Sequence, residues 1–575
     1  MFELKMISLI KISFLLPMIT FKKIVDQVVD LLVKNSKFTR EEIEKLLIKT
    51  NSDKKKDFVI FFGSLTDKPE EIALEIKKSL ENINQRIITD IEASKTSLSF
   101  NLNKKEFFGE ILKTIIEKEN SFGSNQIGNG ETVVLDYSSP NIAKIFHVGH
   151  FRTTILGNFI KNLFNFSGYK TVSINHLGDW GKQFGLVLLG YEKYGSAEEL
   201  EKDPLMHLFH VYVKISKEKE IHDEAKEIFR KMEEENDEKY MKQWNYFREI
   251  SIKKYKELYK LLNVEFDSYS GESFYNESAK EFLKTTNLAK ADEDGSKYVD
   301  CGKLGNALIS KSDGTTLYLT RDICAVIYRM QTYNPSKIIY VVSSEQELHF
   351  KQLFCIAEKL GYDKKIFKHV NFGLVKGMST REGKVHFIED VIEIATNVMH
   401  DFIKDKNNIV DKQTVALTLA ISFLLVCDFS AKRVKGYTFN IEQRAKTEKG
   451  QAIGPNLQYT HCRLVSIERK NDENNSIDYK TINYDLIAEK CVEDLMYKLL
   501  WFEHVVELCL NDYEPSRLVF YLQDLCSSIN SIINILKVKD ADKDVAEARL
   551  AVFKSARIVL HNGIKLLGIN PLFRM

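Results

Sequence analysis

The stretch from residue 133 to residue 164 constrains the fold more than any other part of this sequence. The run Val-Val-Leu at 133–135 is short, apolar and β-branched, which predicts a buried strand. Turn residues follow at 138–141, and from Gly149 onward apolar side chains recur at helical spacing. A buried strand, a polar turn and a helix in this order predict one crossover unit of a parallel α/β sheet.

Two histidines, His147 and His150, lie between this strand and this helix, on either side of Gly149. The free N–H groups and the dipole of a helix N-terminus form a natural anion site. Imidazoles there can donate hydrogen bonds to phosphate oxygens, and Lys144 adds a positive charge. Gly149 leaves room for a flat ring to pack on the backbone. The pattern predicts a nucleotide-phosphate site; the alternative is two ordinary polar residues near a helix cap.

The same stretch resembles the signature of class I aminoacyl-tRNA synthetases, in the form carried by arginyl-tRNA synthetases of the eukaryotic cytoplasmic-like type. It reads SSPNIAKIFHVGH at 138–150, and R-x-T-x-x-G-N follows at 152–158. Residues 175–185 read NHLGDWGKQFG, which is similar to a second family segment. This resemblance implies a multidomain α/β protein. Its parts are a Rossmann-type catalytic domain with a helical insertion, a small N-terminal α+β domain and a C-terminal all-α helix bundle.

A chain of 575 residues is too long for one core and predicts three to four domains. Composition predicts a hydrophobic N-terminal tail. The resemblance implies a tRNA-contacting α+β domain, the catalytic domain with its insertion, a helical connector and a helical anticodon-binding domain. Their expected bounds are 1–20, 21–128, 129–400 (insertion about 186–262), 401–440 and 441–575. Two interpretations of residues 1–20 stay open, an over-extended start or a targeting segment. For residues 21–128, the alternative to a tRNA-contacting domain is a plain structural appendage.

Net charge and cysteine spacing limit the kinds of partner, metal site and compartment to be expected for this chain. The net charge of +1 provides no global basic field, so any RNA contact must come from local patches. The eight cysteines are scattered without a C-x-x-C pair, which argues against a structural zinc site and for free thiols in a reducing compartment. The apolar run in residues 1–20 is too short and broken to span a bilayer. We expect a cytoplasmic protein with no membrane partner; a monomer is one open possibility.

A substrate guanidinium requires carboxylates that can accept its planar fork of donors. Carried over residue by residue, the resemblance implies that six side chains bind arginine: Asp136, Asn141, Glu272, Tyr318, Asp322 and Gln346. Lysine would leave some of these acceptors unpaired, which is the physical origin of discrimination. A structural salt bridge is the competing role for Asp322.

Residues 376–384 read KGMSTREGK, where class I synthetases carry a mobile K-M-S-K-S-type loop that brings cations to the triphosphate. Gly377 stands at the first lysine, which Lys144 replaces by resemblance, and Thr380 and Glu382 are further departures. The resemblance implies catalytic roles for His147, His150, Lys144, Met378, Ser379 and Arg381. It implies ATP binding by the first three of these with Gly149, Met378 and Ser379, and Mg²⁺ on the leaving pyrophosphate.

Residues 450–464 read GQAIGPNLQYTHCRL and resemble a family motif of the anticodon-binding domain. The residues implied to bind tRNA are Tyr459, His461, Arg463 and Met575. Exposed aromatic rings can stack on unpaired bases; for any single ring, a place in the core is the alternative. Helical periodicity from Tyr484 onward predicts a bundle.

Other local patterns predict further elements. The segment from Ile72 to Ile88 has helical spacing, and the apolar runs at 338–342 and 370–375 predict strands. Two β runs flank the Asp313-Gly314 turn, which predicts a hairpin.

The resemblance implies ATP-dependent ligation of L-arginine to the 3′-terminal ribose of tRNA(Arg) through arginyl-adenylate. By resemblance, activation of arginine requires the tRNA. Two alternatives stay open: a class I synthetase for another amino acid, and a catalytically impaired tRNA-binding paralogue. Tyr318, Asp322 and Glu272 favour arginine ligation over a synthetase for another amino acid. The paired histidines favour arginine ligation over a catalytically impaired paralogue.

Overall fold

The computed structural model describes most of the chain, with gaps. The described residues are 33, 58–61, 69–80, 88–95, 97–218, 221–376, 387–407, 409–438, 453–472, 477–479, 481–487 and 489–575. The expected tail at 1–20 and the loop residues Met378, Ser379 and Arg381 lie outside them.

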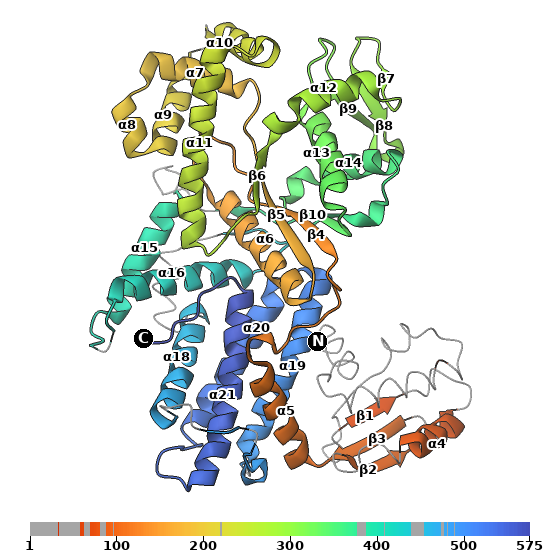
Figure 1. Cartoon of the computed structure of the whole chain (residues 1–575), viewed down its shortest axis with the longest axis vertical. Helices are drawn as coiled ribbons and strands as arrows, with labels where there is room; N and C mark the ends of the chain where they lie inside the picture. The colour runs from red at the N-terminus through yellow and green to blue at the C-terminus, as the bar shows by residue number, and fades with distance from the viewer. Residues whose placement is uncertain are drawn as a thin grey trace.

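A parallel sheet of five strands stands at the centre of the molecule (Figure 1). The strands are β4 (Thr132–Asp136), β5 (Lys170–Leu177), β6 (Ser268–Gly271), β10 (Lys337–Tyr340) and β11 (Phe367–His369). Their order is β11-β10-β4-β5-β6, so the chain builds outward from β4 on one side and then returns to the other. The neighbours β4 and β10 therefore flank the topological switch point, where open parallel sheets bind ligands.

Alternation along β4 explains why the sheet is a middle layer. Val133 and Leu135 belong to the core shared with α6 (Val148–Phe166), whereas Val134 belongs to the core shared with α13 (Tyr318–Tyr333) and α14 (Glu347–Lys359). Successive strand residues point to opposite faces, so an unbroken apolar run is buried on both. The predicted strand, turn and helix at 133–164 are confirmed.

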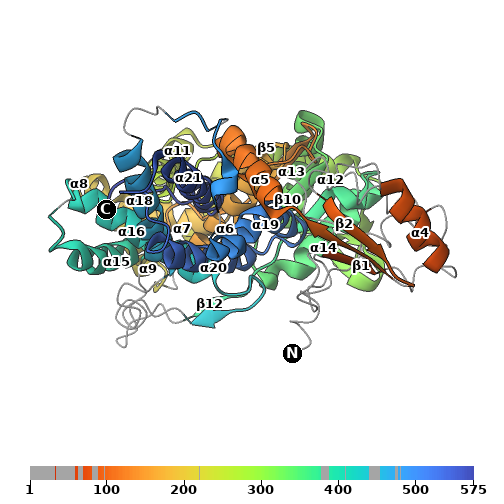
Figure 2. The same ribbon diagram turned by 90° about the horizontal axis from the view of Figure 1, so that it is seen from below.

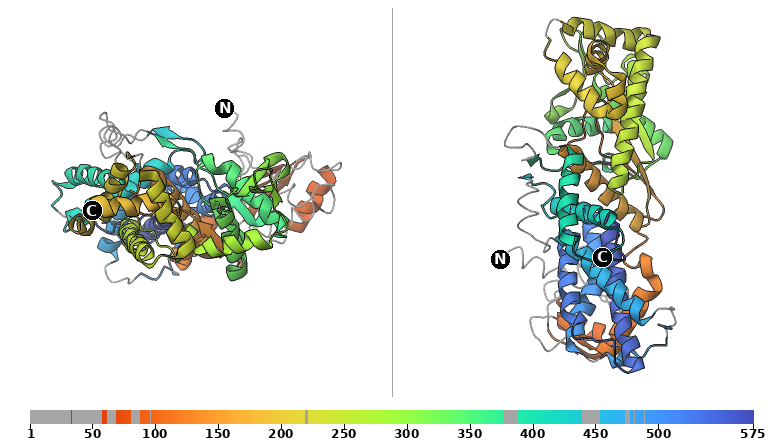
Figure 3. Two further views of the ribbon diagram at one scale, coloured as in Figure 1. Left: turned by 90° about the horizontal axis from the view of Figure 1, so that it is seen from above. Right: turned by 90° about the vertical axis from the view of Figure 1, so that its left-hand side faces the viewer.

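The stretch after β5 is helical, as expected for 186–262. It forms α7 (Gln183–Tyr194), α8 (Ala197–Lys202), α9 (Pro204–Ile215), α10 (His222–Arg230) and α11 (Glu238–Leu261), which lie at one end of the elongated molecule (Figures 1 and 3). Beside it, α12 (Asn276–Thr285) lies next to an antiparallel sheet of β7 (Lys290–Ala291), β8 (Lys297–Asp300) and β9 (Asn306–Ser310).

The other end is a helix bundle (Figures 1 and 2). Its helices are α15 (Ile388–Ile403), α16 (Lys412–Phe429), α18 (Ile453–Asn471), α19 (Lys490–Asp512), α20 (Pro515–Ile533) and α21 (Lys543–Leu566). Helix α16 is apolar and long enough to cross a membrane, but 72% of its 18 residues are buried inside the protein. It is therefore a core helix, and the predicted bundle is confirmed.

The N-terminal part contains an antiparallel sheet in the order β1-β3-β2, set to one side with α4 (Figure 2). Its elements are β1 (Phe58–Phe61), α4 (Pro69–Leu80), β2 (Ile88–Ala93) and β3 (Ser97–Leu102). Helix α5 (Lys104–Lys118) leaves this sheet and packs against α21. Asn562 of α21 donates to the carbonyls of Glu119 and Phe122, at 2.9 and 3.0 Å, which fastens the segment to the bundle.

Three local predictions were wrong. The helix expected from Ile72 to Ile88 is described over Pro69–Leu80 as α4, and Ile88 begins β2 instead. The hairpin expected around Asp313 has one bridge, Ser310 to Thr316, because Tyr318 already begins α13. The strand expected at 370–375 lies earlier, as β11 over Phe367–His369; beyond it, the backbone carbonyls of residues 371 and 373 accept hydrogen bonds from arginine side chains instead of a neighbouring strand.

Candidate active site

A cavity of about 380 Å³ opens at the carboxyl ends of β4 and β10, at the switch point. Its lining comes from the turn after β4, the start of α6, the end of β10 and a segment before α15. The lining residues are Ser138, Ser139, His147, Gly149, His150, Thr153, Val341, Val342, Ser343, Glu345, Phe372, Leu374 and Val375. Three residues predicted from sequence, His147, Gly149 and His150, thus lie together on one wall.

His147 caps helix α6 with its own ring. Its Nδ1 accepts hydrogen bonds from the backbone N–H groups of Gly149 (3.1 Å) and His150 (3.4 Å), and Nδ1 of His150 accepts from the N–H of His147 (3.4 Å). A ring nitrogen that accepts carries no proton, so both neutral rings have their proton on Nε2. Each Nε2–H is therefore a donor directed away from the backbone.

The surroundings keep both rings neutral. Burial lowers the pKa of His147, and the charge of Lys144 lowers it further. Burial holds the pKa of His150 well below its usual value, helped by His147 and Lys144. A Cβ on Gly149 would lie 2.9 Å from Cε1 of His147, so glycine here allows the ring to fold back over the helix end.

The turn after β4 is strained and held. Ser138, Ser139 and Ala143 have φ of 72°, 49° and 56°, in the left-handed region that side chains rarely adopt. Ser139 N–H donates to Asn175 at 3.1 Å, and Ser138 N–H donates to Thr153 at 3.2 Å. Strain of this kind persists only where the surrounding structure over-determines the backbone, and it gathers at functional sites.

Helix α11 of the insertion supports the segment between this turn and the histidines. The hydroxyl of Tyr255 donates to the carbonyls of Asn141 and Lys144, both at 2.8 Å, and Ser251 accepts from the N–H of Ala143 at 3.2 Å. Both side chains are fully buried. The sequence predicted only that this insertion is helical and missed this support.

Lys144 is half-buried, with Nζ 5.7 Å from the ring centre of Tyr212 on α9. Burial lowers the pKa of its ammonium group. It lies outside the cavity lining and acts on the histidine pair through its charge.

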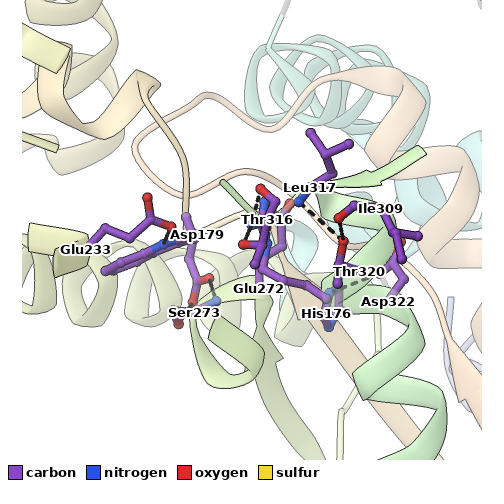
Figure 4. Close-up of polar contacts among 12 residues, drawn as sticks. His176, Asp179, Glu233, Glu272, Ser273, Ile309, Thr316, Leu317, Thr320 and Asp322 are labelled. Atoms are coloured by element: carbon purple, nitrogen blue, oxygen red, sulfur yellow. Dashed lines mark hydrogen bonds and ion pairs between the residues drawn. The ribbon is translucent and has the colours of Figure 1, made fainter. Parts of the chain in front are cut away.

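A second polar cluster joins β5, the segment after β6, and α13 (Figure 4). Asp322 accepts a hydrogen bond from Nε2 of His349 at 2.8 Å, and its other oxygen lies 3.7 Å from Nε2 of His176. These contacts lower the pKa of Asp322 although burial opposes them. Glu272 accepts two hydrogen bonds from Arg321, at 2.7 and 3.0 Å. Burial raises the pKa of Glu272, with Arg321 opposing.

The other residues predicted to bind arginine are spread around this cluster. Tyr318 is 56% exposed, with its ring 5.2 Å from that of His349. Gln346 is exposed just before α14, and Asn141 is bridged to Gly178. Asp136 is buried, and its carboxylate lies 2.7 Å from Nη2 of Arg329. In this structure Asp136 therefore already has a cationic partner.

Asp179 fixes the loop after β5. Its fully buried carboxylate accepts hydrogen bonds from Arg248 (2.8 Å) and from the N–H and hydroxyl of Ser273 (both 2.9 Å). Figure 4 shows Asp179 beside Ser273, the residue after Glu272. This loop therefore determines where Glu272 stands.

Two family models match this chain, one over the sheet and its site and one over the helix bundle. Residues 111–441 match the model described as tRNA synthetases class I (R), catalytic domain, and residues 457–575 match the DALR anticodon binding domain. The chain belongs to the arginyl-tRNA synthetase family. This confirms the predicted family, the multidomain α/β fold and the enzyme class.

Relatives support the same placement along almost the whole chain. An arginine–tRNA ligase of Encephalitozoon cuniculi is 54% identical, over 96% of this chain and 100% of its own length. A probable cytoplasmic arginine–tRNA ligase of Dictyostelium discoideum is 39% identical, over 94% and 98%. The crystal structure of arginyl-tRNA synthetase from Plasmodium falciparum shares the fold with a TM-score of 0.75, over 97% and 100% of the two chains, at 24% identity.

In this family member, the residues predicted to bind tRNA differ in access. Tyr459 is 49% exposed, whereas His461 is fully buried and its Nδ1 lies 2.8 Å from the carbonyl oxygen of Leu572. Arg463 donates to Asn530 at 2.8 Å, and Met575 is half-buried at the chain end. The structure thus gives His461 a contact with the C-terminal segment and leaves Tyr459 the most open of the four.

Sequence reasoning missed several residues that build the site. They are Arg152, Tyr255, Ser251, Arg321 and His349. Ser251 and Tyr255 are four apart on one helix face, a spacing that could have revealed a supporting stripe. Arg321 and His349 adjoin predicted residues but carry no pattern of their own.

Proposed function

We propose that this chain ligates L-arginine to tRNA(Arg) through arginyl-adenylate, and that the cavity at the switch point holds the ATP. The observation that carries this is the capped histidine pair, which fixes two neutral Nε2–H donors at the mouth of that cavity. Neutral Nε2–H groups beside a helix N-terminus can donate to phosphate oxygens without any prior change of protonation. The cavity volume of about 380 Å³ and the donor chemistry both suit a nucleotide.

In this proposal, His147, His150, Gly149 and Lys144 position the phosphates, together with Met378, Ser379 and Arg381 of the following loop. Neither reaction step requires a protein nucleophile, because the substrate carboxylate and then the ribose hydroxyl attack. Positioning and charge stabilisation then supply the rate. Mg²⁺, bound through the phosphates themselves, would neutralise the leaving pyrophosphate, a mode that needs no dedicated protein cage.

The guanidinium site is proposed at Asp322, Glu272 and Tyr318, with Asn141 and Gln346 at the other end of the substrate. Asp322 supports this because the two histidines beside it hold its carboxylate ionised. Asp136 has a supporting role here, since Arg329 already pairs with it.

The domain roles follow from the same proposal. Residues 21–128 contact the tRNA, 129–400 carry the chemistry with an insertion near 186–262, 401–440 connect, and 441–575 bind the anticodon through Tyr459, His461, Arg463 and Met575. We propose a cytoplasmic protein without structural zinc. The cytoplasmic name of the Dictyostelium relative supports the compartment, which fractionation and mass spectrometry of the native N-terminus would test.

The decisive experiment charges bulk tRNA with each amino acid in the presence of ATP and Mg²⁺. We expect arginine alone to be attached, and arginine-dependent pyrophosphate exchange to require tRNA. Charging with a different amino acid, or with none, would overturn the proposal. Full exchange without tRNA would refute only the tRNA requirement.

A further inference from the structure

Arg152 is a completely buried arginine on α6. Its Nη1 donates to the carbonyls of Gly373 (2.6 Å) and Lys435 (3.2 Å), and its Nη2 donates to the carbonyl of Arg433 (3.2 Å). Its Nε lies 3.5 Å from Oδ1 of Asp428, on α16. One side chain thus joins α6 to two separate backbone segments and to a second helix, α16.

Two aromatic rings enclose this guanidinium. The ring centres of Tyr437 and Phe372 lie 5.1 and 5.8 Å from Cζ of Arg152, and the hydroxyl of Tyr437 donates to Asp428 at 2.7 Å. Water is excluded from the group, so its interactions with carbonyls and with Asp428 are stronger than they would be at the surface.

The two backbone segments approach so closely that side chains would not fit between them. A Cβ on Gly373 would lie 2.2 Å from the nitrogen of Gly436, and a Cβ on Gly436 would lie 2.7 Å from the carbonyl oxygen of Leu374. Immediately beyond this contact, β12 (Val375–Lys376) and β13 (Tyr437–Thr438) pair in parallel. Gly373 and Gly436 therefore allow the contact that brings the carbonyls to Arg152.

The segment 372–375, which Arg152 contacts at Gly373, is also a wall of the proposed nucleotide cavity. Phe372, Leu374 and Val375 line that cavity, as do His147 and His150, which precede Arg152 by five and two residues. The histidine wall and the 372–375 wall share no strand, since β11 ends at His369. A backbone bridge joins Phe372 to Ser343, and Arg152 ties the 372–375 wall to the histidine wall through the carbonyl of Gly373.

We propose that Arg152 is a positioning residue for the ligation reaction. It holds the 372–375 wall at the separation from the histidine pair that the nucleotide requires, with Asp428 as its counter-charge. It touches neither substrate nor reacting atoms. The inference rests on the proposed function, because that function assigns the cavity to ATP.

Lysine cannot replace this arginine. Three carbonyls and one carboxylate around a planar fork need donors in several fixed directions, whereas an ammonium group is a compact point charge on a flexible stem. The contacts of Arg152 also extend to the C-terminal helices. Arg433, whose carbonyl accepts from Arg152, donates its N–H to the carboxylate of Glu514 at the start of α20, at 3.1 Å.

The test measures arginylation by the full chain with Arg152→Lys, varying ATP and arginine separately. We expect the KM for ATP to rise about tenfold or more, while the KM for arginine stays within about threefold, because only the nucleotide wall is displaced. The matched control is Arg557→Lys, which weakens a 2.7 Å pair with Glu468 in the helix bundle. We expect the control to leave the KM for ATP unchanged.

Asp428→Asn provides a second variant if Arg152→Lys does not fold, because it keeps the shape and removes only the counter-charge. It should raise the KM for ATP in the same direction. An unchanged KM for ATP in a folded variant at either position would overturn the inference. Failure of the unaltered protein to charge arginine would instead refute the proposed function, so the two failures are distinguishable.

Discussion

The rings of His147 and His150 stack with their centres 3.7 Å apart and their planes 17° apart, each capping the backbone N–H of the other. The same two side chains thus cap a helix and offer donors to a ligand. Capping uses Nδ1 and the proposed phosphate contact uses Nε2, so substitution can separate the observed role from the proposed one.

His150→Asn should separate them. The side-chain oxygen of asparagine can replace Nδ1 as the capping acceptor, but nothing replaces the Nε2 donor. Loss of one such donor costs about 10²–10³ in kcat. We therefore expect a loss of this size with little change in thermal stability. His150→Ala should lose a similar rate and also about 1 kcal/mol of stability. Equal rates for the His150→Asn variant and the unaltered protein would remove His150 from the chemistry.

The acid limb of the activity profile should depend on Lys144. Both histidines have pKa values below the usual one, so they are neutral at pH 7 and protonate only as the pH falls. Protonation of Nδ1 breaks the cap. The charge of Lys144 helps to lower both values, so Lys144→Met should move the loss of kcat/KM to higher pH.

Lys256→Met is the control for this shift, since Lys256 also lies over a tyrosine ring, 4.8 Å from the centre of Tyr269. The pH profile of arginylation should be unchanged in the control. If kcat/KM of Lys144→Met fell at the same acid pH as in the unaltered protein, Lys144 would not act on the histidines.

Asp322→Asn should weaken arginine binding selectively. The substitution keeps the shape but removes the ionised acceptor beside His349 and His176. Removing one partner of a charged pair costs about 2–5 kcal/mol, which should appear in the KM for arginine and not in the KM for ATP. Glu358→Gln, on the outer surface of α14, is the control. A parental KM for arginine in Asp322→Asn would make this carboxylate a structural one.

The sequence predicted the elements whose pattern is local. Unbroken apolar runs located β4 and β10, and helical periodicity located α6 and the C-terminal bundle. It could not predict the end of β11, because the carbonyls of Asn371 and Gly373 accept hydrogen bonds from Arg433 and Arg152. Tertiary hydrogen bonds there override a strand-like pattern.

The site residues likewise divide into those with a local sequence pattern and those placed by tertiary packing. The pattern around Gly149 predicted both histidines and the strand-to-helix turn. The insertion residues that hold the turn, Tyr255 and Ser251, lie more than 100 residues away in the chain. Their role depends on a packing contact that no local spacing encodes. Asp136 was predicted at the substrate, and only the structure shows Arg329 beside it.

Tyr459 and His461 should respond differently to substitution. Tyr459 is half-exposed, so Tyr459→Ala should leave stability unchanged and raise the KM for tRNA, since stacking on one base is worth about 1–3 kcal/mol. His461→Ala should instead destabilise the bundle, because it removes a buried partner of Leu572. Thermal unfolding and tRNA titration distinguish them, and a Tyr459→Ala variant with an unchanged KM for tRNA would contradict an RNA contact.

The C-terminal segment should loosen in mild acid. His461 and His561 lie 3.2 Å apart, and burial lowers the pKa of each to about 4. Since both values fall below the ordinary 6.5 of the unfolded chain, the stability they contribute is complete above pH 6.5 and is lost as the pH falls toward 4. His561→Asn keeps a donor for His461 but removes one titration, so the decline of the unfolding free energy over this range should become shallower. Hydrogen exchange at residues 570–575 should rise over the same range in the unaltered protein. Identical pH dependence in the two proteins would show that this histidine pair does not control the segment.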